Sequence, residues 1–284
     1  MLRKFGRFMT VVLTAAATAL TATSCATDDG AKPAEMDFSM IELGTPADYL
    51  RKLLGVTGPA FSVSTACSSS AKAFASARRL IEVGVADAAL VGGVDGRCRF
   101  AMNGFHALGA LAQGACRPLA PDRDGINLGE GVALFMLERE ACASAGGGIR
   151  VRLAGVGESS DAWHATAPDP EGRGAEAAMR AAMAEAGLAP SDVAYVNLHG
   201  TGTPANDAME MKAVARVFTN LKDLKIESTK TMTGHCLGAA GAIEAAICWL
   251  YLSSGHVKGA ALSNSFAFGG SNACVALVPE GGDA

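Results

Sequence analysis

Three segments of the chain combine a nucleophilic or basic side chain with small residues and a turn. In the first, Cys67 follows a short apolar run and precedes a segment with helical spacing. A thiol at a helix N-terminus lies near the positive end of the helix dipole and near unpaired backbone N–H groups, which favour the thiolate. The thiolate is the form that attacks electrophiles. Cys67 is therefore a candidate nucleophile, with a buried structural cysteine as the alternative.

The second segment, residues 195–204, reads YVNLHGTGTP. An apolar strand delivers His199 to its end, and a glycine turn follows. Functional sites of α/β proteins gather at strand ends. A hydrogen-bonded loop histidine would give the same pattern, so His199 alone does not decide between a site and a structural role.

The third segment, residues 228–235, reads STKTMTGH and precedes a small-residue segment with helical spacing. His235 at the start of a helix favours a neutral imidazole, which can donate a hydrogen bond to a developing oxyanion. Glu244 lies inside the otherwise apolar helix, where an isolated carboxylate is costly unless it is paired. Lys230 is its predicted partner.

Taken together, a cysteine, two histidines, a lysine and glycine-rich turns on separate strand ends indicate acyl transfer through a thioester. The elements that must position them alternate between strand and helix, which predicts α/β layering. Strands are predicted over residues 61–64, 88–94, 129–137, 151–156, 193–198, 260–263 and 273–278. Helices are predicted over residues 45–54 (Thr45 as N-cap), 71–84, 175–186 (Gly187 as C-cap), 208–218 and 234–252.

Composition sets wider limits. The 284 residues are 50% hydrophobic and 18% charged, which suits one large or two ordinary folded domains and excludes a disordered chain. The net charge of −4, with no basic block, argues against nucleic acid as a partner. The eight cysteines form no CxxC pair, so they predict neither a metal site nor a disulfide framework.

Unpaired cysteines are typical of a reducing compartment, whereas the N-terminus points to export. Residues 1–25 carry three basic residues, an apolar run over 8–20 and then Cys25, which resembles a bacterial export signal ending in a lipoprotein-type cysteine. The run is too short to span a membrane. Ala22 stands where lipoprotein signals usually carry Leu, and an amphipathic or misassigned leader is the alternative. Residues 26–40 are polar and read as a tether.

Four ordered motifs carry a family resemblance. They resemble the β-ketoacyl-[acyl carrier protein] synthases, the thiolase-like condensing enzymes, from about Glu42 to Val278. Residues 118–131 are also similar to a segment of that family. The motifs are VSTACSSS at 63–70, VNLHGTGTP at 196–204, KTMTGH at 230–235 and NSFAFGGSN at 264–272.

The resemblance implies a layered α/β/α/β/α fold with an incomplete first half. Residues 41–150 would form the partial N-terminal half with the cysteine, and residues 151–284 the C-terminal half. Family members carry a further α/β lead-in before the cysteine strand, so strands of the first sheet are expected to be missing. A second shortfall is expected between Leu252 and Ala261. Both losses are expected to weaken sheet closure and the acyl tunnel.

The resemblance also implies roles. Cys67 would take the acyl chain, while His199 and His235 would assist decarboxylation of a malonyl-carrier. Lys230 would balance charge with Glu244. The amides of Cys67 and Phe268 would form the oxyanion hole, with Phe268 as a gating aromatic beside the supporting Gly269 and Gly270. No metal or cofactor is implied beyond the pantetheine arm of the carrier.

The expected partners are acyl carrier protein, acyl and malonyl thioesters, and a second subunit in a homodimer or heterodimer. The expected pathway is fatty acid, polyketide or aryl polyene biosynthesis in the cytoplasm. Two alternatives stay open: a catalytically silent carrier-binding or interaction subunit, and an exported lipoprotein that carries a condensing-enzyme remnant.

Other polar residues receive plainer interpretations. Asp207 and Glu210 read as charges at a helix N-terminus, and Arg123 and Asp124 as residues that order the site entrance. The remaining histidines and cysteines are expected to pack rather than react: His106, His164, His256, Cys98, Cys116, Cys142, Cys236, Cys248 and Cys274.

Overall fold

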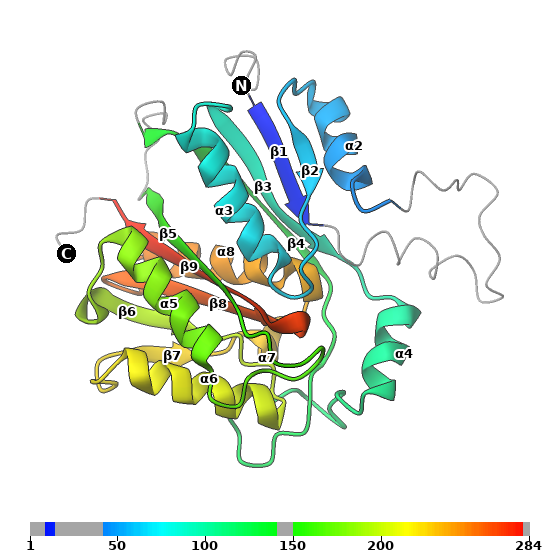
Figure 1. Ribbon diagram of the computed structural model, residues 1–284, viewed down its shortest axis with the longest axis vertical. Helices are drawn as coiled ribbons and strands as arrows, with labels where there is room; N and C mark the ends of the chain where they lie inside the picture. The colour runs from blue at the N-terminus through cyan, green and yellow to red at the C-terminus, as the bar shows by residue number, and fades with distance from the viewer. Residues whose placement is uncertain (1–8, 15–41, 141–149, 281–284) are drawn as a thin grey trace.

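The computed structural model describes residues 9–14, 42–140 and 150–280, which form two mixed β-sheets with helices between and outside them (Figure 1). The first sheet has the order β2-β1-β3-β4. In it β1 (Met9–Thr14) pairs in parallel with β2 (Ala60–Ser62) and β3 (Ala88–Asp95). The strand β4 (Gly131–Glu138) runs antiparallel to β3.

The second sheet repeats this pattern and adds one strand. Its order is β7-β6-β8-β9-β5. Here β6 (Val193–Asn197) is parallel to β7 (Lys225–Glu227) and β8 (Ala260–Ala267), and β9 (Ser271–Pro279) is antiparallel to β8. A fifth strand, β5 (Val151–Ser160), pairs with β9, whereas β4 has no such neighbour among the described strands. The prediction of an incomplete first half is consistent with this difference.

Two helices fill the space between the sheets. The helices α3 (Ser69–Glu82) and α8 (Ala240–Ser253) share one apolar core with side chains of both sheets. Small residues let them approach closely, since a Cβ added at Gly241 would lie 3.0 Å from the backbone nitrogen of Ala71. Cys67 lies just before α3 and His235 lies shortly before α8, so this central layer brings these two residues together, whereas His199 follows β6.

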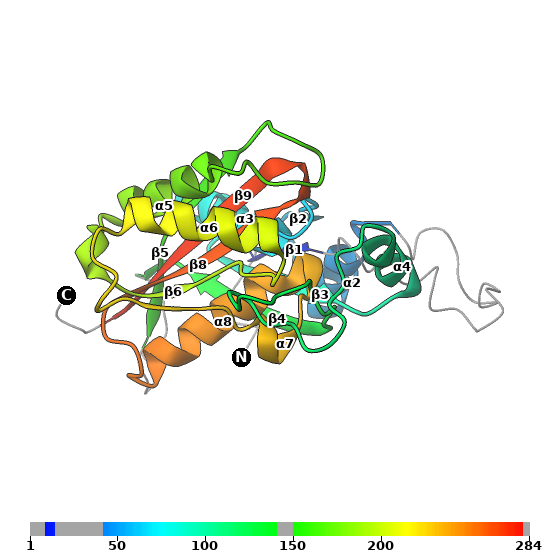
Figure 2. The same cartoon turned by 90° about the horizontal axis from the view of Figure 1, so that it is seen from below.

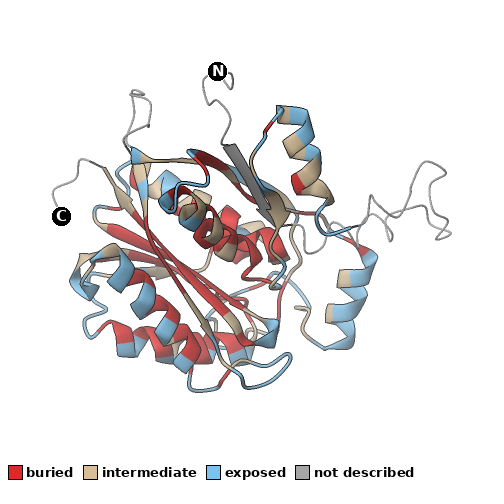
Figure 3. Cartoon of the chain, turned by 45° about the horizontal axis from the view of Figure 1, so that its top comes forward, coloured by how far each residue is buried: buried red, intermediate tan, exposed pale blue. Residues whose placement is uncertain are grey.

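Outer helices complete the layers. The helices α5 (Arg173–Ala186) and α6 (Pro204–Val217) cover the far face of the second sheet around a second apolar core (Figure 2). On the first sheet, α2 (Thr45–Leu54) packs against β1 and β2. The predicted α/β/α/β/α layering is confirmed. Burial is strongest along the central helices and the second sheet (Figure 3).

The remaining elements are short. They are the helices α4 (Arg99–Ala107) and α7 (Lys230–Thr233) and the 3-10 turns η4 (Pro190–Asp192), η5 (Leu237–Ala239) and η6 (Phe268–Gly270). Neither α4, α7, η4 and η6 nor the short strand β7 was predicted, whereas η5 falls inside the helix predicted over 234–252.

Helix ends were predicted with mixed success. The range of α2 is correct, but its N-cap is Gly44 rather than Thr45. Gly187 ends α5 in the left-handed conformation, as predicted. The single helix expected over 234–252 is wrong: positive φ angles of 66° at Gly234 and 43° at Leu237 interrupt it, and α8 begins only at Ala240.

The N-terminal segment has a role that composition did not suggest. Residues 9–14, inside the run that resembles an export leader, form β1 between two parallel neighbours. An apolar run suits a buried strand as well as a leader, so hydrophobicity could not separate the two. Cys25, Cys142 and the proposed tether lie outside the described residues. Among the described helices, none is long and apolar enough to cross a membrane.

The second expected shortfall leaves the second sheet intact. Residues 254–259 connect α8 directly to β8, and β8 still pairs with both β6 and β9. The expected loss of closure in this sheet is therefore wrong. The first sheet instead ends at β4, where Val132, Leu134 and Met136 are 60%, 44% and 38% exposed on one face.

Candidate active site

Cys67 lies in a tight turn between β2 and α3. The residue before it, Ala66, has φ of 51°, a left-handed conformation that is uncommon outside glycine. Neighbouring hydroxyls hold this turn: Ser68 Oγ donates to the Thr65 carbonyl at 2.8 Å, and Ser69 Oγ donates to the Ala66 carbonyl at 2.5 Å. The Ser/Thr-rich sequence around the cysteine thus fixes where its sulfur points.

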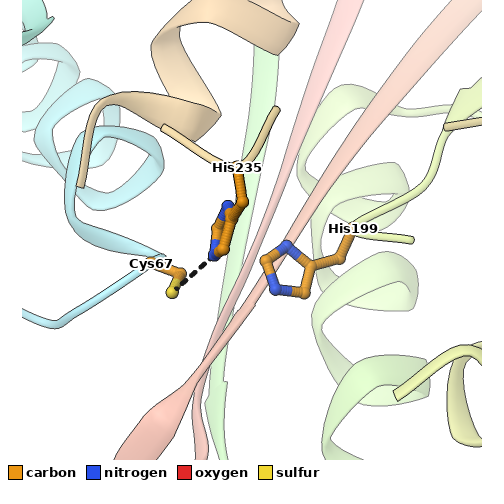
Figure 4. A group of neighbouring side chains, drawn as sticks. All are labelled: Cys67, His199 and His235. Atoms are coloured by element: carbon orange, nitrogen blue, oxygen red, sulfur yellow. Dashed lines mark hydrogen bonds between the residues drawn. The ribbon is translucent and has the colours of Figure 1, made fainter. Parts of the chain in front are cut away.

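The structure brings the three candidate reactive side chains together (Figure 4). Cys67 Sγ lies 2.9 Å from His235 Nε2. The rings of His235 and His199 are nearly perpendicular, with centroids 5.3 Å apart. All three side chains are buried. A purely structural cysteine and a purely structural loop histidine would not explain why these groups converge.

The loop formed by residues 118–131, which is similar to a segment of the family, positions His235. The His235 amide donates to the Asn127 carbonyl at 2.7 Å, and the Gly129 amide donates to the His235 carbonyl at 3.1 Å. A Cβ on Gly129 would lie 2.2 Å from the Thr233 carbonyl oxygen, so only glycine fits there. The backbone of His235 is therefore clamped from outside its own segment.

Glu210 positions His199. This role of Glu210 was not predicted from the sequence. Its two carboxylate oxygens accept from the amides of His199 and Gly200, both at 2.8 Å, and one also accepts from Asn264 Nδ2 at 3.0 Å. Glu210 is fully buried, so its interpretation as a charge at a helix N-terminus is wrong. Its position seven residues into α6 and the polar Asn264 were signals that it faces inward.

Asp207 lies in the first turn of α6, as predicted, and is buried. Its carboxylate accepts from the Leu119 amide at 2.9 Å and the Gly202 amide at 3.2 Å, and lies 3.4 Å from Arg123 Nε. These contacts tie the turn after His199 to the loop before β4. Arg123 thus orders this loop, while Asp124 lines the cavity beside it.

Lys230 and Glu244 form the predicted pair. Lys230 Nζ donates to Glu244 Oε1, and both side chains are about 1% exposed. A buried carboxylate or ammonium is costly alone, so each accounts for the burial of the other. The ammonium also lies near enough to the two histidines to disfavour their protonation.

Burial sets the protonation states of the reactive groups. It raises the pKa of Cys67 to about 12, although Lys230 acts in the opposite direction. The expectation that a helix N-terminus would favour the thiolate is therefore wrong. Burial, followed by Lys230, holds the pKa of His199 and of His235 well below the usual range. The predicted neutral imidazole of His235 is confirmed, with burial rather than a helix start as its main cause.

Two cavities meet at Cys67. One, of about 370 Å³, is lined by Cys67 and both histidines, and the other, of about 330 Å³, is mainly apolar. Phe268 and Phe105 line both cavities, and their ring centroids are 5.8 Å apart. Phe268 therefore stands between the cavities, where the expectation of a gating aromatic would place it.

The glycines after Phe268 shape its turn. Gly269 and Gly270 have φ of 78° and 72°, and a Cβ on Gly270 would lie 2.9 Å from Asp161 Cβ. The backbone conformation therefore requires glycine at both positions. Phe105 was missed because it lies on the unpredicted helix α4, although the i, i+4 spacing of Ala101 and Phe105 was a usable signal.

Among the described residues, no other histidine or cysteine lines the cavity that holds Cys67 and both histidines, and of these others Cys98 alone lines the apolar one. Cys98 lines the apolar cavity, and its sulfur accepts from the Ala101 amide at 3.3 Å at the start of α4. His256 stacks on Tyr251, and His164 accepts from two amides of its own turn. The described cysteines are all free and buried: Cys67, Cys98, Cys116, Cys236, Cys248 and Cys274.

Two matching sheets around a central helix pair, with a Cys-His-His cluster where the halves meet, define a thiolase-like fold with a candidate reactive centre at its middle. Residues 6–143 match the N-terminal domain of the β-ketoacyl synthases, and residues 151–261 match the C-terminal domain. The chain belongs to the β-ketoacyl synthase family. The N-terminal match includes β1.

Relatives support this assignment. Nodulation protein E of Rhizobium sp. (strain N33) is 39% identical over 85% of this chain, which covers 67% of that relative. The 3-oxoacyl-[acyl-carrier-protein] synthase 2 of Staphylococcus aureus (strain COL) is 41% identical over 72% of this chain and 51% of its own length. The chain therefore spans about half to two thirds of these curated relatives.

A solved structure shows the same fold. A chain from the complex of a ketosynthase (ApeO) with its chain length factor (ApeC) from Xenorhabdus doucetiae is 38% identical, with a TM-score of 0.87. The match covers 98% of this chain and 76% of that one.

Proposed function

We propose that this chain catalyses the decarboxylative condensation of an acyl thioester with a malonyl thioester, both presented by acyl carrier protein. The observation that carries the proposal is the 2.9 Å contact between Cys67 Sγ and His235 Nε2 at the junction of two cavities. One cavity is apolar enough for an acyl chain, and the other leads to both histidines.

In the first half-reaction the Cys67 sulfur attacks the acyl thioester carbonyl. Its proton passes to His235 Nε2, a new sulfur–carbon bond forms, and the carrier thiolate leaves and is protonated in turn. Because the thiol is held neutral by burial, the neighbouring imidazole must accept this proton as the bond forms. The amides of Cys67 and Phe268 would stabilise the oxyanion.

In the second half-reaction the malonyl thioester loses carbon dioxide. The electron pair of the broken carbon–carbon bond becomes an enolate, whose oxygen accepts hydrogen bonds from the neutral rings of His199 and His235. The enolate carbon then attacks the acyl group on Cys67, which forms the β-ketoacyl product and releases the cysteine sulfur as a thiolate that takes up a proton from solvent. Burial, followed by Lys230, keeps both rings neutral, and the sequence of steps needs no metal or organic cofactor.

The proposed partners follow from the same chemistry and from relatives. The solved relative from Xenorhabdus doucetiae is a ketosynthase in complex with a chain length factor. We propose acyl carrier protein as substrate carrier and a second ketosynthase-type subunit as partner, in a homodimer or heterodimer. Fatty acid or polyketide biosynthesis in the cytoplasm, where malonyl thioesters are made, is the proposed setting.

Intact-protein mass spectrometry tests the proposal. Purified protein incubated with acyl-carrier should gain one acyl mass, and Cys67→Ala should gain none. Cys98→Ala, which removes the other thiol lining the apolar cavity, should still load. Malonyl-carrier added to the loaded enzyme should then yield β-ketoacyl-carrier. Absence of both loading and condensation would refute the enzyme and favour a silent carrier-binding subunit.

A further inference from the structure

The reactive centre offers one sulfur and two nitrogen donors to a common point. The ligand atoms of Cys67, His199 and His235 all lie within 4.8 Å of one another. Zinc is bound in proteins by such thiolate and imidazole donors, with three protein ligands and one open position at reactive sites. We propose that these three residues also bind Zn²⁺, and that the bound ion blocks acyl loading. The blocking effect rests on the proposed function, but the binding does not.

The histidines are available as ligands. The Nδ1 atoms of both His199 and His235 are buried and have no hydrogen-bond partner among the described residues. The hydrogen bond of His235 Nε2 runs to Cys67 Sγ itself, which is the proposed third ligand. A metal between the sulfur and the rings therefore replaces one hydrogen bond and disrupts no other contact of these side chains.

The donor atoms must shift to reach a tetrahedral arrangement. With zinc–sulfur and zinc–nitrogen bonds of about 2.3 and 2.0 Å in a tetrahedral site, sulfur and nitrogen lie about 3.5 Å apart. Cys67 Sγ and His235 Nε2 must separate from 2.9 Å toward that value, and the wider pairs, at up to 4.8 Å, must close toward it. All three residues line the cavity of about 370 Å³, which has room for the ion and a water ligand.

The donor set also predicts selectivity. None of the three ligands is a carboxylate, so hard cations such as Mg²⁺ and Ca²⁺ find no preferred donors. Binding converts the thiol to a zinc-bound thiolate and releases its proton to solvent. The positive charge of the nearby Lys230 disfavours binding of a metal ion, but the ion pair with Glu244 partly neutralises that charge. We therefore expect reversible binding of Zn²⁺, Co²⁺ and Cd²⁺.

Occupancy removes the nucleophile. Zinc bound to the sulfur lowers its nucleophilicity and fills the space beside it that a thioester carbonyl must enter, and a sulfur that already carries an acyl group cannot form the thiolate ligand. Metal binding and acyl loading should therefore exclude each other. Zinc added first should prevent loading, and acyl loading first should prevent metal binding.

Cobalt substitution tests the site without using activity. Full-length protein titrated with Co²⁺ should show thiolate-to-cobalt charge transfer with one ion per chain, and Zn²⁺ but not Mg²⁺ should displace it. Cys67→Ser, which preserves volume, and His199→Asn should each weaken binding at least by the roughly 10- to 100-fold that loss of an outer-shell partner causes. Cys274→Ala, which removes a buried thiol that lines neither cavity, should bind as the parent does.

The outcomes separate the two claims. Charge transfer that persists in Cys67→Ser, or that is equally strong for a chain already acylated, would overturn the metal site. Zinc that binds without slowing acyl loading would overturn the blocking effect. A chain that never loads an acyl group but loses cobalt binding in Cys67→Ser keeps the metal site and refutes the proposed function alone.

Discussion

Replacing Glu210 by glutamine should separate the two half-reactions. Glu210→Gln keeps the shape of the side chain but turns one acceptor oxygen into a donor. In the native protein the carboxylate receives three N–H groups: the amides of His199 and Gly200 and the side-chain amide of Asn264. The glutamine oxygen can keep the His199 and Asn264 donors only if its NH₂ group faces the Gly200 amide.

This conflict sets the magnitude. A buried donor left facing another donor costs about 1–3 kcal/mol, and hydrogen bonds to a charged group are worth about 1.5–3 kcal/mol. We expect the variant to lose about 2–3 kcal/mol of unfolding free energy. The loss falls on the turn that aims His199, and a shift of about 1 Å in a catalytic group can cost about 100-fold in rate. Among the described residues, Glu210 hydrogen-bonds to neither Cys67 nor His235, so acyl transfer should change little.

Two single-turnover assays check this prediction. Acyl loading is followed by intact mass, and decarboxylation by release of labelled carbon dioxide from malonyl-carrier. Loading should stay within about threefold of the parent, while decarboxylation falls about 100-fold. Glu82→Gln, the same change at an exposed position on α3, is the matched control. Equal losses in both assays, or no loss in either, would refute the positioning role of Glu210.

Three further predictions follow from burial and charge. Lys230→Met should cost about 3–5 kcal/mol of unfolding free energy because it leaves Glu244 buried and unpaired, and the double variant with Glu244→Leu should recover most of it in thermal unfolding. With the pKa of Cys67 raised to about 12, its alkylation by iodoacetamide should rise about tenfold per pH unit from pH 7 to 9 without a plateau, since the thiolate fraction grows in that proportion; a plateau near neutral pH would contradict a buried neutral thiol. Leu134→Thr on the exposed face of β4 should change the unfolding free energy by no more than about 0.5 kcal/mol. The variant should also show less self-association in light scattering, because it removes part of an exposed apolar face. Unchanged self-association would show that the molecules do not associate through this face.

The sequence predicted the strands and most helices of the second half because local signals suffice there. Buried strands such as 193–198 and 273–278 are short apolar runs, and Gly187 marks a helix end by its own conformation. The elements it missed carry weaker signals. The helix α4 exposes much of its surface, and β7 is only three residues long and depends on pairing with β6.

The reactive residues were predicted because each lies in a distinctive local motif. Their supports were not, because they act across the sequence. Asn127 holds the backbone of His235 from more than 100 positions away, and Glu210 reaches Asn264 over 54 positions. A motif indicates which side chain reacts, whereas the groups that aim it are selected by tertiary packing. The interpretation of the apolar N-terminal run as a leader failed for a related reason, since β1 is identified only by its pairing with two neighbouring strands.

The error about the Cys67 thiol shows which force dominates at this site. A helix N-terminus contributes about 0.3–1 kcal/mol toward the thiolate, less than one pKa unit. Raising the pKa from 9.0 to about 12 corresponds to about 4 kcal/mol in favour of the thiol, so burial outweighs the dipole several-fold. A preformed thiolate, whose charge would favour zinc or an alkylating agent at neutral pH, is therefore not the resting state. Attack on a thioester then depends on the imidazole at 2.9 Å, which makes His235 necessary for acyl loading as well as for decarboxylation, whereas Glu210, acting through His199, is needed only for the second step.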